Sequence, residues 1–159
     1  MTSTSSLVSY ECGAFVARLS LTIRNGPNDN FAVGIISSKL RNDALTDFFL
    51  FVKGGAGWDV HSIRQYARQN RKVTHRGFAC LRGKEGQRVV LEADGREGER
   101  TLKLSQDGET QPVFFTNIPV PFRFAVYIYQ NNDAVEIESV EFVDEPQMEG
   151  GTLPVAMDE

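Results

Sequence analysis

Seven basic residues and no acidic one lie between Asp59 and Glu85, and this basic segment (residues 61–84) is the part of the chain best equipped for chemistry. The basic residues are Arg64, Arg68, Arg71, Lys72, Arg76, Arg82 and Lys84. An arginine presents a planar fork of donors that can hold a carboxylate or a phosphate with two hydrogen bonds. The segment therefore indicates recognition of an acidic protein segment or of nucleic acid, although a solvated surface would have the same composition.

Two aromatic residues, Trp58 and Tyr66, accompany these arginines. Aromatic and arginine side chains supply much of the energy of protein interfaces, so Trp58 and Tyr66 are candidate anchors for a partner. A buried or loop-bracing position is an equally good interpretation of Trp58. The candidate partner-binding residues are Trp58, Arg64, Tyr66, Arg68, Arg71 and Lys72.

The charge of the whole chain is unevenly distributed. The net charge is only −4, yet no basic residue follows Arg123, whereas acidic residues are frequent there. Such separation gives the protein a positive and a negative end, which steers the association of charged partners. Because the protein is acidic overall and carries no RNP-type or helix-turn-helix motif, nucleic acid is the weaker alternative as a partner.

No catalytic or metal-binding motif accompanies these charges. His61 and His75 lack the convergent ligands that a zinc site requires. Glu136 and Glu138 have a spacing that a retaining glycosidase could use, but they stand in a run of surface acids. Gly54–Gly57 lacks the Gly-Lys-Ser/Thr of a phosphate loop. The sequence predicts a protein that is not an enzyme and has no catalytic residue, no metal and no cofactor.

The elements that must position the candidate residues are β-strands. Apolar and polar residues alternate from Phe15 to Arg24, and again in several runs between Gly86 and Phe142, where Asp107-Gly108 supplies a tight turn. This alternation is typical of antiparallel strands with one face buried. Phe31–Ser37 and Phe48–Val52 are mostly apolar and are also predicted strands. About ten short strands predict an all-β fold, a two-layer antiparallel β-sandwich, with a closed barrel as the alternative.

We expect one domain over residues 7–144. Residues 1–6 are rich in Ser and Thr and are predicted to be a disordered lead-in. Residues 145–159 contain Pro, Gly and acidic residues and are predicted to be a flexible acidic tail. Residues 61–76 fit either short helical turns or an irregular loop that contains strands.

Two further expectations concern the cellular environment. Cys12 and Cys80 are expected to be reduced and buried, although a bridge between them stays open. The chain contains no run of about 20 apolar residues and no secretory signal. An intracellular location, cytoplasmic or nuclear, is therefore expected.

A series of short motifs runs through the second half of the chain: Arg100–Leu104, Asp107-Gly108, Pro112–Phe115, Ile118-Pro119 and Phe124–Val126. This order resembles the second half of SPRY (B30.2-like) domains, in which a strand pair around an Asn-Gly or Asp-Gly turn precedes a step ending in proline and an apolar strand. Phe15–Ile36 is similar to the opening strands of that family, and Trp58 after its glycines is similar to the family's Gly-Trp step. The resemblance extends over residues 10–143.

The resemblance implies a concanavalin-like sandwich that binds short peptides or protein surfaces through loops at one edge, without a cofactor. Loops Gly54–Arg76 and Ala93–Glu99 would form that edge. The basic residues 64–76 replace the aromatic-rich stretch of the family, so the family's binding residues are not transferred to them. Galectins share the sandwich, but their His-x-Asn-Pro-Arg signature is absent from the sequence.

Three functions remain as hypotheses. The first is a protein-interaction module, the second is a nucleic-acid-binding subunit that uses residues 61–84, and the third is a carbohydrate-binding sandwich. A salt titration separates the first two from the third, because nucleic-acid affinity falls steeply with ionic strength and sugar affinity barely responds.

Overall fold

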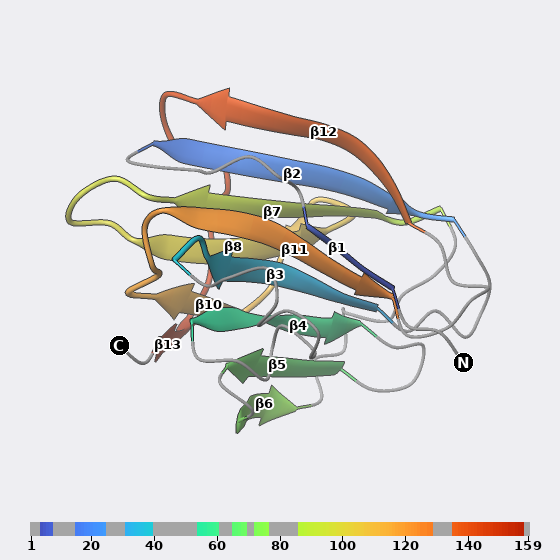
Figure 1. Ribbon diagram of the computed structural model, residues 1–159, viewed down its shortest axis with the longest axis horizontal. Helices are drawn as coiled ribbons and strands as arrows, with labels where there is room; N and C mark the ends of the chain where they lie inside the picture. Colours follow the sequence, from blue (N-terminus) through green and yellow to red (C-terminus); the bar gives the residue numbers. More distant parts are fainter. Residues whose placement is uncertain are drawn as a thin grey trace.

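A computed structural model describes residues 4–7, 15–24, 31–39, 54–60, 65–69, 72–76, 86–128 and 135–157. These residues form strands, turns and loops and contain no helix. The strands build two stacked sheets, which we call sheet A and sheet B (Figure 1). The predicted all-β sandwich is therefore confirmed.

Sheet A has six strands, and every neighbouring pair in it is antiparallel. In spatial order they are β1 (Thr4–Leu7), β11 (Phe122–Ile128), β3 (Phe31–Ser37), β4 (Gly55–Val60), β5 (Gln65–Gln69) and β6 (Lys72–Arg76). The sequence was compatible with either helical turns or a strand-containing loop over residues 61–76. The structure has strands there, β5 and β6. The predicted strand Phe48–Val52 and both cysteines lie outside the described residues.

Sheet B contains the strands with the clearest alternation in the sequence. In spatial order they are β12 (Val135–Val143), β2 (Val16–Ile23), β7 (Arg88–Asp94), β8 (Thr101–Gln106), β10 (Val113–Thr116) and β13 (Leu153–Ala156). A short strand, β9 (Glu109–Thr110), pairs with β8 after the turn at Asp107-Gly108. The sheet is antiparallel except for β10 and β13, which run parallel.

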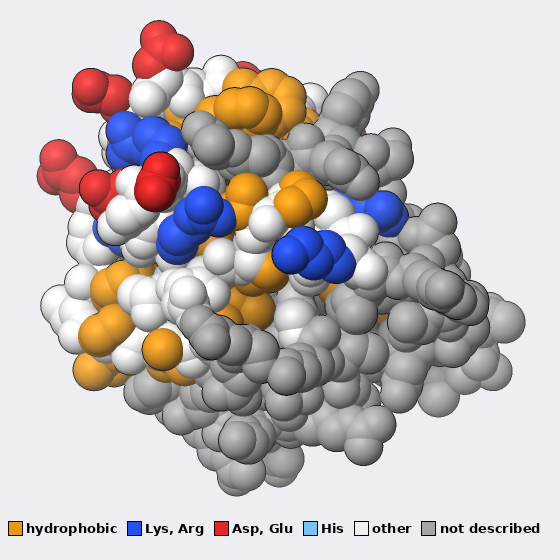
Figure 2. All heavy atoms as spheres, turned by 60° about the vertical axis from the view of Figure 1, so that its left-hand side comes forward, with side chains coloured by type: hydrophobic (Ala, Val, Ile, Leu, Met, Phe, Trp, Pro, Cys, Tyr) orange, Lys and Arg blue, Asp and Glu red, His pale blue; other side chains and the backbone are white. Residues whose placement is uncertain are grey.

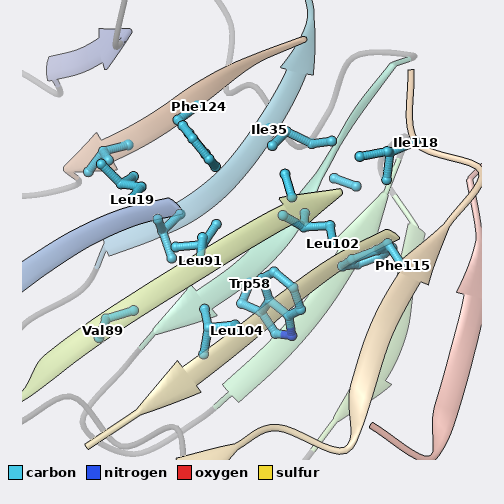
Figure 3. Packing of buried hydrophobic residues seen from close by; sticks show 14 of the residues in the cluster. Leu19, Ile35, Trp58, Val89, Leu91, Leu102, Leu104, Phe115, Ile118 and Phe124 are labelled. Atoms are coloured by element: carbon cyan, nitrogen blue, oxygen red, sulfur yellow. The ribbon is translucent and has the colours of Figure 1, made fainter. Parts of the chain in front are cut away.

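The core fills the space between the two sheets. Alternate residues of β2, β7 and β8 point inward, so that Leu19, Leu91 and Leu104 are fully buried. Figure 3 shows Leu104 beside Trp58 of β4, whose indole ring meets the Phe115 ring edge-on at 5.1 Å between ring centroids. Burying such side chains supplies most of the favourable free energy of folding.

The backbones of β3 and β4 approach each other closely where Gly34 stands opposite Gly57. A Cβ atom added to Gly34 would lie 2.0 Å from the Ala56 carbonyl oxygen, and one added to Gly57 would lie 2.2 Å from the Val33 carbonyl oxygen. No side chain fits at either position without moving backbone. The glycines that looked like a flexible loop in the sequence therefore belong to a tightly paired strand, which fixes the position of Trp58 next to them.

The two sheets are offset from each other. In the view of Figure 1, β12 of sheet B lies at the top, beyond the strands of sheet A, and β5 and β6 of sheet A lie at the bottom. Of the β12 side chains, only Val135 and Val140 pack against the core, and both are partly buried. The inward side of β12 is therefore only partly covered.

The predictions for the two terminal extensions are wrong for the residues that the structure describes there, 4–6 and 145–157. Residues 1–6 were expected to be disordered, but Thr4–Leu7 forms β1 and pairs with Ala125–Ile128 of β11. Residues 145–159 were expected to be a flexible tail, but Leu153–Ala156 forms β13, and Met148 and Met157 are buried. Neither extension has a strong alternation of apolar residues. Each is held instead by pairing with a strand that is distant in sequence, which a local pattern does not reveal.

The segment between β12 and β13, Asp144–Gly151, crosses the outer face of sheet B, and we call it the strap. It is held by Glu92, a buried carboxylate on β7 that accepts hydrogen bonds from the backbone N–H groups of Gln147 and Met148 at 3.0 and 3.1 Å. Arg18 of β2 donates a hydrogen bond to the Gln147 side chain and forms an ion pair with Glu92. Buried carboxylates are costly without such partners, so Glu92 fixes the path of the strap.

Candidate binding surface

One end of the sandwich gathers loops from both sheets, and we call it the Gly95 end. It consists of Ser37–Lys39 at the end of β3, Asp94–Arg100 from the end of β7 to the start of β8, and Thr116–Pro121 from the end of β10 to the start of β11. These segments lie at the left of Figure 1, where β3 and β7 end and where β8 and β11 begin. Alternating strand directions therefore bring segments that are far apart in sequence to one surface.

Backbone hydrogen bonds tie these loops to one another. The Ser38 N–H donates to the Pro121 carbonyl at 3.0 Å, and the Ile118 N–H donates to the Arg100 carbonyl at 3.3 Å. The Gly95 N–H donates to the carbonyl of Phe15, the residue that precedes β2, at 3.0 Å. The first of these bonds lies beside sheet A and the other two join strands of sheet B, so the surface is supported by both layers.

The Asp94–Gly98 loop is organised by an ion pair. Arg96 donates two side-chain hydrogen bonds to the Asp94 carboxylate, at 3.0 and 2.8 Å, and its backbone N–H donates a third at 3.1 Å. Burial of the Asp94 carboxyl group raises its pKa, but the hydrogen bonds from Arg96 outweigh this effect and leave the pKa lowered. The same contact raises the pKa of Arg96, first through the hydrogen bond to Asp94.

Two residues of the Gly95 end hold a backbone conformation that is rare for residues with side chains. Arg100 has a φ of 53° and Asn117 has a φ of 56°. Asn tolerates this left-handed region better than other residues, and the Asn117 amide also donates a hydrogen bond to the Met157 carbonyl at 3.2 Å. For Arg100 the conformation is costly and persists because the surrounding contacts fix it. The loop backbone is thus held in a defined shape.

The exposed side chains of the Gly95 end carry both signs of charge. Lys39 is exposed, as are Glu97 and Glu99, and Arg96 keeps part of its surface in water. Figure 2, which turns the left side of Figure 1 toward the viewer, shows basic side chains spaced over this surface and acidic ones gathered at its upper left. A surface of this kind offers hydrogen bonds and ion pairs to a polar partner.

The prediction that Trp58 anchors a partner is wrong. Its side chain is fully buried in the core against Phe115, and no described residue accepts a hydrogen bond from its indole nitrogen. The sequence signal was an aromatic residue beside a glycine-rich stretch. That signal is the same for a loop anchor and for a residue on a buried strand.

The remaining candidate residues fall on or around β5 and β6. Tyr66 and Arg68 belong to β5 and Lys72 to β6, and nothing is described of their side chains. Arg64 and Arg71 lie outside the described residues. The binding role of these five residues therefore stays a prediction.

The register of β5 and β6 places their two connections at opposite ends of sheet A. Gln69 pairs with Ala56 and with Lys72, at the end of the sheet where β4 begins and β3 finishes. Val60 and Gln65, which flank Arg64, lie at the other end. The predicted loop Gly54–Arg76 thus does not form one edge, but its part around Gln69 and Lys72 lies on the same side of the molecule as the Gly95 end.

The predicted loop Ala93–Glu99 does contribute to the Gly95 end, since Ala93 and Asp94 close β7 and the next residues form its exposed turn. Sequence reasoning missed Ser37–Lys39 and Thr116–Pro121. Both reach this surface only through strand pairing between residues far apart in the chain. The one local signal was Asn117-Ile118-Pro119, a typical turn composition.

Two negative observations apply to the described part of the chain. No group of three or more His, Cys, Asp or Glu residues there is arranged to hold a metal ion. No helix of sufficient length and hydrophobicity to cross a membrane occurs there.

Comparisons with known proteins support the fold. No protein-family model matches the sequence, and no curated protein sequence matches it either. Among solved structures, the SPRY domain of human HERC1 is similar with a TM-score of 0.60 and 16% identity over 92% of this chain and 85% of that chain. The PSpry domain of TRIM65 has a TM-score of 0.63 with 14% identity, over 85% of this chain and 68% of that chain.

A carbohydrate-binding module, CBM66 from Bacillus subtilis, is also similar, with a TM-score of 0.52 and 16% identity over 87% of this chain and 80% of that chain. Identities this low show the fold and nothing finer. The two SPRY structures have the higher TM-scores of these three, in agreement with the resemblance seen in the motifs. The chain therefore has the fold of a SPRY-like β-sandwich.

Proposed function

We propose that this protein is a non-enzymatic interaction module that binds a peptide or a protein surface through the loops of the Gly95 end. The observation that carries this proposal is the set of hydrogen bonds that fixes these loops within each sheet, together with the connection Thr116–Pro121, which passes from sheet B to sheet A and is bonded on both sides. Loops fixed before binding lose little conformational entropy when a partner arrives, which favours affinity. The likeness to SPRY domains supports the same proposal.

Loops are better candidates than the sheet faces. The outer face of sheet B is crossed by the strap, which is fixed to Glu92 and Arg18. On the outer side of sheet A, Ala32 and Ile36 alternate with core residues and are nevertheless buried. A carbohydrate-binding sandwich that uses an open sheet face, the third hypothesis, loses support from these contacts, although the likeness to CBM66 keeps sugar binding as an alternative.

The chemistry of the partner follows from the exposed groups. Arg96 and Lys39 can bind carboxylates, and Glu97 and Glu99 can bind basic groups. Two further basic residues, Arg68 of β5 and Lys72 of β6, lie on the same side of the molecule as the Gly95 end. For this reason the proposal retains an acidic segment as the partner. Nucleic acid remains the weaker alternative, and a cytoplasmic or nuclear location is part of the same proposal.

Selection from a random peptide library displayed on phage tests the proposal, because a random library contains peptides of every charge pattern. We expect enriched peptides to bind the wild-type protein and to lose at least about tenfold in affinity for the double variant Glu97→Lys/Glu99→Lys, because charges at a contact decide specificity. A matched double variant, Glu109→Lys/Glu149→Lys, changes two exposed glutamates near the Asp107-Gly108 turn at the opposite end. It should bind as the wild type does.

The outcome that contradicts the proposal is equal binding by both double variants, or no enrichment at all. A sugar array and a short nucleic-acid panel, measured at low and high salt, then distinguish the alternatives. Binding to a sugar that is insensitive to salt would favour the carbohydrate-binding sandwich, whereas binding that collapses with salt would favour nucleic acid.

A further inference from the structure

The strand β12 is the open edge of sheet B. It pairs with β2 along one side, and no described strand pairs with its other side. An unpaired strand edge presents a row of backbone N–H and C=O groups that can pair with another strand. The opposite edge of the sheet, β13, is less suited to such pairing because it has four residues and contains Pro154.

Apolar side chains beside this edge are exposed to water. In the register with β2, Ile137 and Phe142 stand opposite Leu21 and Ala17, which face the core. Ile137 is nevertheless 42% exposed and Phe142 is 52% exposed, because β12 extends beyond the cover of sheet A (Figure 1). Phe15, itself 45% exposed, meets the Phe142 ring edge-on at 5.2 Å. Clustered apolar surface of this kind indicates a contact site.

A hollow adjoins the aromatic pair. It has a volume of about 680 Å³ and is lined by Phe142, Val143, Asp144, Glu145, Pro146 and Gln147. It lies where β12 ends and the strap begins, so a strand added to β12 would run directly into it. Figure 2 shows a hydrophobic patch at the top of the molecule, the level at which β12 lies in Figure 1, with acidic side chains beside it.

The charge of this edge is negative and only partly neutralised. Glu136 pairs with Arg24 at 2.6 Å, and Glu138 lies 3.6 Å from Arg88. Glu141, by contrast, is exposed and makes no ion pair within the described residues, and neither do Asp144 and Glu145. Arg18 stands opposite Glu141 in the register, but its side chain is bound to Glu92 and Gln147. The carboxylate of Glu141 is therefore available to a basic group of a partner.

We propose that β12 binds an extended segment of another protein by strand addition, and that this segment alternates apolar residues with Lys or Arg. Its apolar residues would cover Phe142 on the inward side, and its basic residues would face Glu141 on the outward side. Main-chain hydrogen bonds supply affinity in this mode, and alternate side chains supply specificity. The bulge between Ile137 and Ser139 interrupts regular pairing, so the added strand pairs with Ser139–Val143.

A second copy of this chain is a poorer occupant than a basic strand. Antiparallel pairing of two β12 strands would place Glu136, Glu138 and Glu141 of both copies on one face of the joined sheet. Like charges on neighbouring strands destabilise the pairing. Charge complementarity therefore selects a foreign, basic segment.

Isothermal titration with synthetic peptides tests this proposal. The probe is a short capped peptide of alternating Val and Lys, and its controls are the same peptide with Glu in place of Lys and the same peptide with backbone amides methylated along one edge. Only the first should bind, since the second repels Glu141 and the third cannot complete the ladder. The variants Phe142→Ser and Glu141→Lys should each weaken binding at least about tenfold.

Matched variants elsewhere on sheet B provide the protein controls. Leu153→Ser removes an exposed apolar side chain from β13, and Glu109→Lys reverses an exposed charge at β9. Both should bind the Val-Lys peptide within about twofold of the wild type, as surface changes away from a contact do. Glu97→Lys/Glu99→Lys should also bind it normally, which separates this site from the Gly95 end.

Three results would overturn the proposal: no binding of the Val-Lys peptide to the wild type, equal binding of the methylated peptide, or equal loss in the β13 and β9 variants. Thermal melts of every variant show whether it is folded. If Phe142→Ser fails to fold, Glu141→Lys alone decides, because its side chain is exposed and makes no described contact.

Discussion

Asp94 is the residue of the Gly95 end whose ionisation contributes most clearly to stability. Its side chain is buried and accepts three hydrogen bonds from Arg96, and these lower its pKa in spite of the burial. A carboxyl group with a lowered pKa in the folded state stabilises the protein at pH values above its unfolded pKa. That stabilisation is lost as the pH falls through the folded pKa.

We therefore expect Asp94→Asn to lower the free energy of unfolding by about 1 kcal/mol at pH 7, since Arg96 is partly exposed and water screens the pair. The difference between variant and wild type should shrink below about pH 4, where aspartate in the unfolded chain becomes protonated. Urea unfolding over a pH series measures both quantities. Asp144→Asn is the control, because Asp144 is exposed and makes no described contact. A difference that stays constant down to acidic pH would contradict the role given to the carboxylate.

The burial of Trp58 could not be predicted from the sequence around it. An aromatic residue between glycines is compatible with a binding loop, and only the register of β4 between β3 and β5 turns the indole inward. The decisive feature is the close approach of Gly34 and Gly57, which depends on two segments more than 20 residues apart. No local pattern encodes such a contact.

At the scale of elements, alternation predicted the strands that bury one face against the core. It located β2, β7, β8 and β11 because each carries inward apolar residues at every second position. It missed β1 and β13, because their residues are not alternately apolar and their pairing is non-local. Only one part of the Gly95 end was predicted, the β7–β8 loop, because it has the composition of a turn. The other two segments were missed because only strand pairing brings them next to this loop.

The strap and β13 should contribute substantially to stability, contrary to the expectation of a flexible tail. Met148 and Met157 are buried, and each such side chain contributes about 1.5–3 kcal/mol. Together the two methionines contribute about 3–6 kcal/mol, so we expect a chain that ends at Val143 to melt roughly 6–24 °C below the full chain, from about 2–4 °C per kcal/mol for a protein of this size. Differential scanning calorimetry measures the shift. A chain that ends at Met157 is the control and should melt with the full chain, whereas equal melting of the shorter chain would show that the strap is not structural.

The whole molecule separates its charges in space as well as in sequence. The acidic strand β12 is the edge of sheet B at the top of Figure 1, and the strands β5 and β6, which carry Arg68 and Lys72, lie at the bottom in sheet A. Two acids of β12 already pair with Arg24 and Arg88 of their own sheet. The strands that carry Arg68 and Lys72 therefore belong to the other sheet and do not neighbour β12.

This separation sharpens the prediction for the basic segment. We predict that Arg64, Arg68 and Arg71 are solvent-exposed, so the triple variant Arg64→Glu/Arg68→Glu/Arg71→Glu should change the free energy of unfolding by no more than about 0.5 kcal/mol. The same variant should lose affinity for a Glu-rich probe peptide, since three guanidinium groups are replaced by carboxylates that repel the probe. Chemical unfolding and fluorescence anisotropy, measured on one preparation, give the two quantities together. Glu109→Lys/Glu149→Lys, at exposed positions near the Asp107-Gly108 turn, is the control and should leave binding of this probe intact. A strong loss of stability in the triple variant would mean that the arginines are bound within the fold, and unchanged probe binding with an intact fold would mean that they are only solvated.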